Sequence, residues 1–437
     1  MEKYYLAIDL GASSGRHIVG YERNGEVVLD EVHRFTNGVL EKDGHLIWDL
    51  EHLFCEVVNG IKNAVDKYGE IESLAIDTWG VDYALIKDGK PVLPVYAYRD
   101  GRTAKSIPEV DKLTPRDYLF SRTGIAFQTY NTIYQLYEDK MSGRIEGATD
   151  FLLMPELLNY MLTGIVKKEY TNASTTGMVN AQTKKFDTEI IEKLGLPSHL
   201  FPELYEGGDT VGDLKEEIIK KVGKNVKVKL CLSHDTASAF YTAGIFGGDD
   251  AVFISSGTWS LLGNKQTEIH NDKNALEHGF TNEGGVNRTF RFLKNIMGMW
   301  IINNVCSENN LTPPELAKLA EESDYSYTVD VNHQDFFAPQ SMTETFKTHL
   351  KNQGAKQLEN IPDLARCAIL SLAKSYAVSV EQFEQDVNKK YDKIVIVGGG
   401  AKNKVLNEFT EKLSGKKVIA LPIEATAIGN IKIQMEN

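Results

Sequence analysis

The clearest candidate for catalytic chemistry is an isolated carboxylate, Asp235, which follows a strand-like run over residues 226–232. The small residues after it suit the start of a helix packed closely on a sheet. A carboxylate at such a strand end can act as the general base that takes a proton from a hydroxyl group, although a lone aspartate there is more often a helix N-cap. His234 and Thr236 stand beside it and could orient a polyol, although such a histidine is more often structural.

A glycine-containing turn follows the opening strand-like run 4–9 and carries donors for an anion. Glycines let backbone N–H groups approach a phosphate, hydroxyl groups add donors, and an arginine adds positive charge. The residues of this turn are Gly11, Ala12, Ser13, Ser14, Gly15 and Arg16. Asp9, just before them, could hold Mg²⁺ through a water molecule. The plain alternative is a tight hairpin turn, and the pattern is not a P-loop, since it lacks the Gly-Lys-Ser/Thr ending.

Two stretches in the second half of the chain have related chemistry. Ser255-Ser256-Gly257-Thr258 follows a strand-like run, as the first turn does, and Gly398-Gly399-Gly400 follows the run 394–397. Consecutive glycines let a flat group such as a base or ribose lie against the backbone, although an ordinary turn explains either stretch alone. Two phosphate-type turns, a glycine platform and an isolated carboxylate together indicate phosphoryl transfer with Mg²⁺ and a base that activates a hydroxyl group.

Two strands, a helix and a further strand are predicted in the same order in each half of the chain, and these elements must position the stretches described above. Near the N-terminus, Asn24-Gly25 joins two strands of a hairpin, Asp49 and Gly69 enclose a helix, and a strand over 71–76 follows. Later, strands within 251–264, a long helix over 364–383 and the strand 394–397 repeat this order. We therefore expect two related α/β domains with a cleft between them.

The expected boundary lies near residue 245, giving domains over 1–244 and 245–437. Residues from about 105 to 225 are mostly helical in pattern, with few strand signals. We expect this segment to be an insertion on the first domain that builds one wall of a substrate pocket.

Composition narrows the class of partner. The 437 residues carry a formal net charge of -13, which argues against nucleic acid or an anionic membrane as a partner, because both require a basic surface. Four cysteines are widely spread without metal-ligand spacing, and the N-terminus lacks a signal-peptide core. No apolar run is long enough to cross a bilayer. A protein of the reducing cytoplasm that acts on small molecules is expected.

Taken together, these motifs resemble those of the FGGY carbohydrate kinases, whose domains are ribonuclease H-like and belong to the actin/Hsp70/hexokinase superfold. The resemblance rests on residues 7–16, 76–82, 97–103, 169–173, 233–239, 255–260, 281–285, 293–298, 396–400 and 424–431. The combination of Asp77-Thr-Trp-Gly-Val-Asp82 with Ser233-His-Asp-Thr236 is typical of the rhamnulose branch of the family. The glycine-rich segments are shared by the superfold.

The resemblance implies ATP-dependent phosphorylation of L-rhamnulose at its 1-hydroxyl group, with Asp235 as the proton acceptor. It implies that the sugar contacts Gly80, His234, Asp235, Thr236 and Asn295. It implies that ATP contacts Ala12, Ser13, Ser14, Gly15, Arg16, Thr258, Asn303 and Gly400, and that Asp9 helps to place Mg²⁺ through water. Asn303 is a departure, because family members carry the longer glutamine there.

Three alternatives stay open at this stage. A kinase of the same family for another ketose or polyol, such as L-fuculose or xylulose, would share every motif, because the helical insertion sets specificity. An ATP-binding chaperone or sugar sensor on the same superfold would give Asp235 no role. An inactive, truncated homologue is the third, because the chain ends at Asn437, soon after the Gly429-Asn430-Ile431 turn, whereas relatives continue further. The last helix is therefore expected to be short, with an uncovered outer face.

Overall fold

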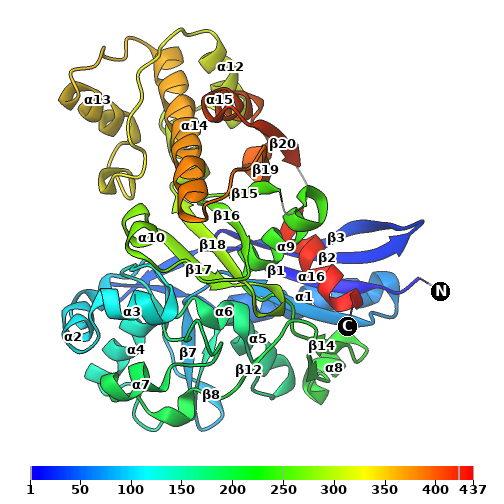
Figure 1. Cartoon of the computed structure of the whole chain (residues 1–437). Helices are drawn as coiled ribbons and strands as arrows, with labels where there is room; N and C mark the ends of the chain where they lie inside the picture. The colour runs from blue at the N-terminus through cyan, green and yellow to red at the C-terminus, as the bar shows by residue number, and fades with distance from the viewer. Residues whose placement is uncertain (1, 249, 422–423, 437) are drawn as a thin grey trace.

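Two mixed β-sheets form the framework of the computed structural model, which describes residues 2–248, 250–421 and 424–436 (Figure 1). The first sheet has the order β13-β14-β6-β1-β2-β3 and the second the order β17-β18-β16-β15-β19-β20. Their strands are β1 (Tyr5–Leu10), β2 (Ser14–Arg23), β3 (Glu26–Thr36), β6 (Ser73–Thr78), β13 (Thr210–Gly212), β14 (Lys227–Lys229), β15 (Ala251–Ser256), β16 (Ser260–Gln266), β17 (Phe280–Gly284), β18 (Phe290–Ile296), β19 (Lys393–Val397) and β20 (Lys417–Leu421).

The two sheets repeat one plan. In the first, β1 pairs antiparallel with β2 and parallel with β6. In the second, β15 pairs antiparallel with β16 and parallel with β19. The predicted fold class, two related α/β units, is confirmed.

The first hairpin and helix form for local reasons. Asn24 and Gly25, between β2 and β3, both have positive φ angles, 55° and 82°, as the tight turns that match strand twist require. Helix α1 (Leu50–Tyr68) begins after Asp49, whose side chain accepts a hydrogen bond from the His52 N–H, and ends at Gly69. The predicted boundaries of this helix are therefore confirmed.

The stretch expected to be one helical insertion is divided between two hydrophobic cores. Helices α5 (Met154–Thr163) and α8 (Glu216–Val222) bury apolar side chains, such as Leu158 and Ile218, in the core of the first sheet. A separate core contains Tyr134, Phe151 and Ile190. The helices around that second core are α2 (Ser106–Leu113), α3 (Arg116–Thr123), α4 (Thr132–Met141), α6 (Tyr170–Ser174) and α7 (Thr188–Leu194).

Short strands extend this region. They are β4 (Val39–Lys42), β5 (His45–Trp48), β7 (Tyr83–Lys87), β8 (Lys90–Pro91), β9 (Val95–Tyr96), β10 (Asp150–Leu153), β11 (Lys168–Glu169) and β12 (Leu204–Tyr205). They form sheets of two or three strands, in the orders β4-β5-β9, β10-β7-β8 and β11-β12.

Helices cover the second sheet. The long predicted helix is α14 (Ile361–Asp386), and its Leu372, Tyr376 and Phe383 lie in the second sheet's core. The other helices of this unit are α10 (Lys273–His278), α11 (Gly298–Glu308), α12 (Pro313–Glu321), α13 (Met342–Asn352) and α15 (Lys404–Ser414). Helices α12 to α15 occupy the upper part of the view in Figure 1. None of the helices in the described ranges combines the length and apolar character needed to cross a membrane.

Two helices, α9 (Asp235–Gly247) and α16 (Ala425–Glu436), pack against each other between the two sheets. Phe240 of α9 packs in one core with Phe253 of β15, whereas Ile431 of α16 packs in one core with Tyr5 and Ala7 of β1. Figure 1 shows them beside each other between the sheets. The prediction that the last helix has an uncovered outer face was wrong for the described residues, because α16 is enclosed by α9 and the first sheet.

Candidate active site

Three carboxylates gather at the edge of the first sheet that is formed by the carboxyl ends of its central strands β1 and β6. Asp9 and Asp77 are the next-to-last residues of the neighbouring parallel strands β1 and β6 and are register partners. Thr78 donates its N–H to the Ser233 carbonyl oxygen at 2.9 Å, which brings the first turn of α9, and with it Asp235, to the same edge. Burial raises the pKa of Asp9 and of Asp77, and the charge of Asp235 raises both further. The charged forms of Asp9 and Asp77 are therefore disfavoured at this edge.

One arginine partly balances this charge. Nη2 of Arg16 donates to Oδ2 of Asp9 at 2.6 Å, and Nη1 binds Glu424, just before α16. In the β1–β2 turn, Gly11 donates its N–H to the Ser14 carbonyl oxygen at 2.9 Å. Arg16 thus holds two carboxylates from the two halves of the chain, a role that the sequence did not indicate.

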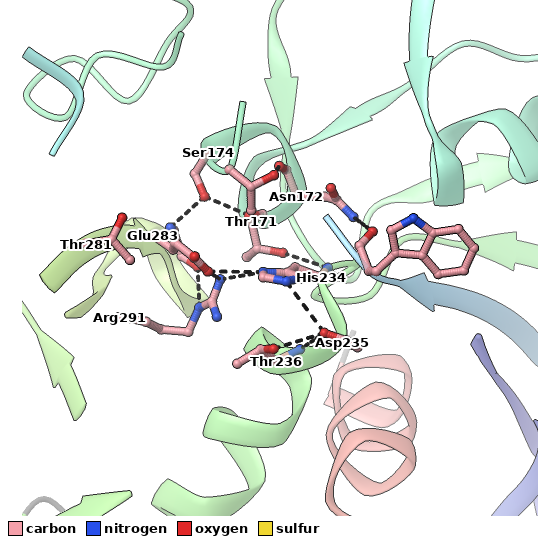
Figure 2. Close-up of polar contacts among 12 residues, drawn as sticks. Thr171, Asn172, Ser174, His234, Asp235, Thr236, Thr281, Glu283 and Arg291 are labelled. Carbon is pink, nitrogen blue, oxygen red and sulfur yellow. Dashed lines mark hydrogen bonds and ion pairs between the residues drawn. The ribbon is translucent and has the colours of Figure 1, made fainter. Parts of the chain in front are cut away.

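A buried charged cluster lies beside Asp235 (Figure 2). Nη2 of Arg291 lies 2.9 Å from Oε2 of Glu283 and 3.0 Å from Nδ1 of His234. His234 Nδ1 lies 3.2 Å from the same glutamate oxygen, and its Nε2 lies 3.5 Å from Oδ1 of Asp235. Burial tends to raise the pKa of Glu283, but the charges of Arg291 and His234 outweigh it and lower this pKa to about 2. Glu283 is therefore ionised and paired.

Asp235 itself is accessible and held in place. It is the first residue of α9, with His234 at the N-cap position, so the N-cap alternative for Asp235 was wrong. Its Oδ1 accepts hydrogen bonds from the N–H and hydroxyl groups of Thr236, at 2.5 and 2.9 Å. The side chain of Asp235 is 31% exposed, whereas that of His234 is 10% exposed. One carboxylate oxygen is thus fixed at the rim of a buried polar cluster.

Glu169 fastens this segment to the first unit. Its Oε2 accepts hydrogen bonds from the Ser233 hydroxyl and N–H groups, at 2.6 and 3.1 Å, and from the Thr171 hydroxyl group at 2.6 Å. The Asn172 side chain donates to the carbonyl oxygens of Ser233 and Trp79, at 3.2 and 3.4 Å. These bonds join the segment before α9 to the segment that follows β6.

Gly80 and Trp79 lie in that second segment. A Cβ atom on Gly80 would meet the Thr175 hydroxyl oxygen at 2.9 Å, so only glycine fits without a shift. Trp79 is 7% exposed and stacks on Trp48 with ring centroids 4.2 Å apart, and both indole N–H groups donate to Asp82. Trp79 is therefore a core anchor of this segment.

The remaining predicted nucleotide residues lie in the second unit. Gly400 packs against Ser256 so closely that a Cβ atom would overlap that side chain. The turn after β15 is exposed and is held to the start of α11, because the backbone N–H of Trp300 donates to the Thr258 carbonyl oxygen at 3.0 Å. Asn303 is exposed on α11. Asn295 is half-buried on β18, on the same face of the strand as Arg291.

The structure therefore brings five of the predicted site residues, Asp9, Gly80, His234, Asp235 and Thr236, to one sheet edge. Thr258 and Gly400 belong to the corresponding edge of the second sheet, where β15 and β19 pair in parallel. Sequence reasoning missed Glu283, Arg291 and Glu169 as parts of the site. Glu169 and Glu283 lie inside the motifs named above, but Glu169 binds Ser233 and Glu283 contacts His234, both far away in the chain, so spacing alone could not reveal these contacts.

Comparisons with known proteins agree with this arrangement. The N-terminal domain of the FGGY family of carbohydrate kinases matches residues 4–241, and its C-terminal domain matches residues 252–436. A rhamnulokinase of Oceanobacillus iheyensis is 40% identical over 100% of this chain and 93% of its own length. A rhamnulokinase of Halalkalibacterium halodurans is 41% identical over 99% of this chain and 93% of its own.

Solved structures show the same fold at low identity. A gluconate kinase from Lactobacillus acidophilus has a TM-score of 0.83 at 15% identity and covers 100% of this chain and 89% of its own. A glycerol kinase from Plasmodium falciparum, solved with ADP, has a TM-score of 0.79 at 16% identity, over 99% of this chain and 89% of its own. At these identities the likeness concerns the fold alone. The two domain matches and the curated relatives together establish that the chain belongs to the FGGY family of carbohydrate kinases.

Proposed function

We propose that this protein phosphorylates L-rhamnulose at its 1-hydroxyl group, with Mg-ATP as the phosphoryl donor, in the cytoplasm. The observation that carries the proposal is Asp235, a partly exposed carboxylate at the first turn of α9 beside a buried charged cluster. Curated relatives that share about 40% of the sequence over the whole chain are named rhamnulokinases, which supports this sugar over other ketoses.

In this proposal Asp235 takes the proton of the attacking hydroxyl group. Thr236 fixes one carboxylate oxygen, which leaves the other for the substrate. The chain positions of Gly80, His234 and Asn295 suit contacts with the sugar. Proton removal by a positioned base contributes roughly 10²- to 10⁴-fold to a rate.

The nucleotide residues are proposed on the same basis. Thr258, Gly400 and Asn303 would hold ATP from the second unit, and the β1–β2 turn, residues 12 to 16, would meet its phosphates from the first. The acidic edge formed by Asp9, Asp77 and Asp235 fits a divalent cation, because burial and repulsion between the carboxylates disfavour the charges of Asp9 and Asp77 without one. Asp9 would hold Mg²⁺ through water, and the ion supplies charge neutralisation for the transferred phosphoryl group.

The test is ADP release by purified protein with Mg-ATP, against L-rhamnulose, L-fuculose, D-xylulose and glycerol in parallel. We expect selective turnover of L-rhamnulose. Asp235→Asn should lower kcat by roughly 10²- to 10⁴-fold while sugar binding, measured by calorimetry, stays within a few-fold. The matched control is Asp324→Asn, at an exposed position of the second unit, which should leave both unchanged. Selective turnover of another sugar would refute the assignment of L-rhamnulose as the substrate. Full activity of Asp235→Asn would refute the assignment of Asp235 as the general base.

A further inference from the structure

Two histidines and an aspartate form a cluster outside the proposed active site. His333 and Asp335 lie at the 3-10 helix Gln334–Phe336, and His349 lies on α13. One nitrogen of each histidine and one carboxylate oxygen all lie within 4.8 Å of one another. We propose that this cluster is a binding site for a borderline divalent metal ion, with Zn²⁺ as the preferred occupant.

The distances suit such an ion. Oδ2 of Asp335 lies 2.9 Å from Nε2 of His349 and 3.3 Å from Nδ1 of His333. Zn²⁺ binds nitrogen and oxygen at about 2.0–2.2 Å in tetrahedral geometry, which places neighbouring ligand atoms roughly 3.3 Å apart. The Nδ1 atom of His333 also accepts a long hydrogen bond, 3.3 Å, from the Asp335 N–H group, which the ion would replace. Only small side-chain movements are therefore needed.

Packing holds the ligands in place. The His349 ring is 14% exposed and has its centroid 5.0 Å from that of Phe336 and 4.8 Å from that of His333. Phe336 packs in turn on Phe346 of α13, with centroids 5.1 Å apart. His333 and Asp335 are about half exposed, so an ion can reach them and water can fill a remaining coordination position. Ligands fixed in advance lose little conformational entropy on binding.

The ligand set selects the metal. Two imidazoles and one carboxylate suit Zn²⁺, Co²⁺ or Ni²⁺, whereas Mg²⁺ prefers oxygen ligands and keeps its waters. The Mg²⁺ that accompanies ATP is therefore a poor competitor. The site is also independent of the proposed function, because its residues share no ligand with the acidic edge around Asp235.

An ion here would link α13 to residues 333–337, which contact the turn after β15 that contains Thr258. The Trp300 indole N–H donates to the Phe336 carbonyl oxygen at 3.2 Å, and the Phe337 ring lies 6.0 Å from the Trp259 ring. Trp259 directly follows Thr258. The expected consequence is a more stable second unit, with slower hydrogen exchange in residues 333–352 when Zn²⁺ is bound.

The experiment titrates chelator-treated protein with ZnCl₂ by calorimetry and with CoCl₂ by visible absorption. We expect one ion per chain and a tetrahedral Co²⁺ spectrum. His349→Phe keeps a ring in the packed slot, and Asp335→Asn keeps the carboxylate's shape. Each should weaken Zn²⁺ binding at least roughly tenfold. The control His52→Asn changes a histidine on α1 and should bind as the unchanged protein does.

The melting temperature of each variant without metal separates lost binding from lost folding. The proposal is overturned if the unchanged protein takes up no Zn²⁺, if both ligand variants bind as tightly as it does, or if His52→Asn is equally weakened. Asp335→Asn, at a half-exposed position, keeps the test decisive should His349→Phe fail to fold. Activity is not a readout, so a failure of the proposed kinase function leaves this result interpretable.

Discussion

Replacing Arg291 by methionine should destabilise the protein strongly and in a pH-dependent way. Arg291 is 2% exposed, and its Nε and Nη2 atoms bind the Gly284 carbonyl oxygen and Glu283, at 2.8 and 2.9 Å. The hydrogen bond from the charged guanidinium group to the Gly284 carbonyl oxygen contributes about 1.5–3 kcal/mol. Removing one partner of the buried ion pair with Glu283 costs about 3–5 kcal/mol, so a loss of at least this size is expected.

The pH dependence follows from Glu283. In the unchanged protein its pKa is lowered to about 2, so the stability it contributes is present above its ordinary pKa and is lost only as the pH falls toward 2. Without Arg291, burial remains and the larger of the two charges that opposed it is gone, so the pKa of Glu283 rises. A carboxyl group whose pKa is higher in the folded than in the unfolded protein lowers the free energy of unfolding at high pH, and this loss disappears as the pH falls. The deficit of Arg291→Met should therefore shrink as the pH is lowered from 8 to 5.

Thermal unfolding at pH 8, 6.5 and 5 measures this effect. A loss of 3–5 kcal/mol in a unit of this size lowers Tm by on the order of 10 °C. The double variant Arg291→Met with Glu283→Gln should recover much of the loss, because no buried charge is left unpaired. Arg34→Met is the matched control, since its ion pair with Glu31 is exposed, and it should cost less than about 1 kcal/mol. Equal deficits at all three pH values would refute the assignment of an ionised, paired Glu283.

Three further changes probe other parts of the molecule. Gly400→Ala would bring a Cβ atom onto Ser256, so KM for ATP should rise by roughly 10- to 100-fold in the ADP-release assay, as expected for a backbone displaced by about 1 Å. Ile431→Ala should cost about 2–5 kcal/mol and, because Ile431 packs on the first sheet, should speed hydrogen exchange in β1 and β2 rather than in β15. Glu169→Gln replaces an acceptor of the Ser233 N–H and hydroxyl groups, so kcat should fall more than sugar affinity, with a stability loss of about 1–3 kcal/mol.

Local signals in the sequence predicted the elements whose causes are local. The Asn24-Gly25 turn, the Asp49 cap and the glycine after α1 each act within a few residues, and each predicted boundary holds. The repeated order of elements was sufficient to predict two related units. The helix start at Asp235 was likewise predicted from neighbouring residues, although the strand before it, β14, ends at Lys229 and not at residue 232 as expected.

Contacts that join distant segments could not be predicted in this way. The pairing of Glu283 with Arg291 depends on the register of β17 and β18, and its contact with His234 depends on how the two units meet. The division of the helical stretch between two cores was missed for the same reason, since the apolar faces of α5 and α8 do not indicate which sheet they cover. The enclosure of α16 likewise depends on a partner helix almost 200 residues earlier.

The packing of α9 and α16 shows that the boundary expected near residue 245 does not coincide with a division between the hydrophobic cores. Helix α9 spans that boundary, and its Phe240 and Ala243 pack in one cluster with Phe253 of the second sheet. Helix α16, from the end of the chain, supplies Ala427 and Ile431 to a cluster with Tyr5 and Ala7 of the first sheet. The first sheet is therefore covered on one side by a helix from the far end of the sequence, and the second by a helix that the boundary divides. Since α9 also begins with Asp235, the proposed base stands on an element whose packing depends on both sheets, and its placement is fixed only when the two units are assembled.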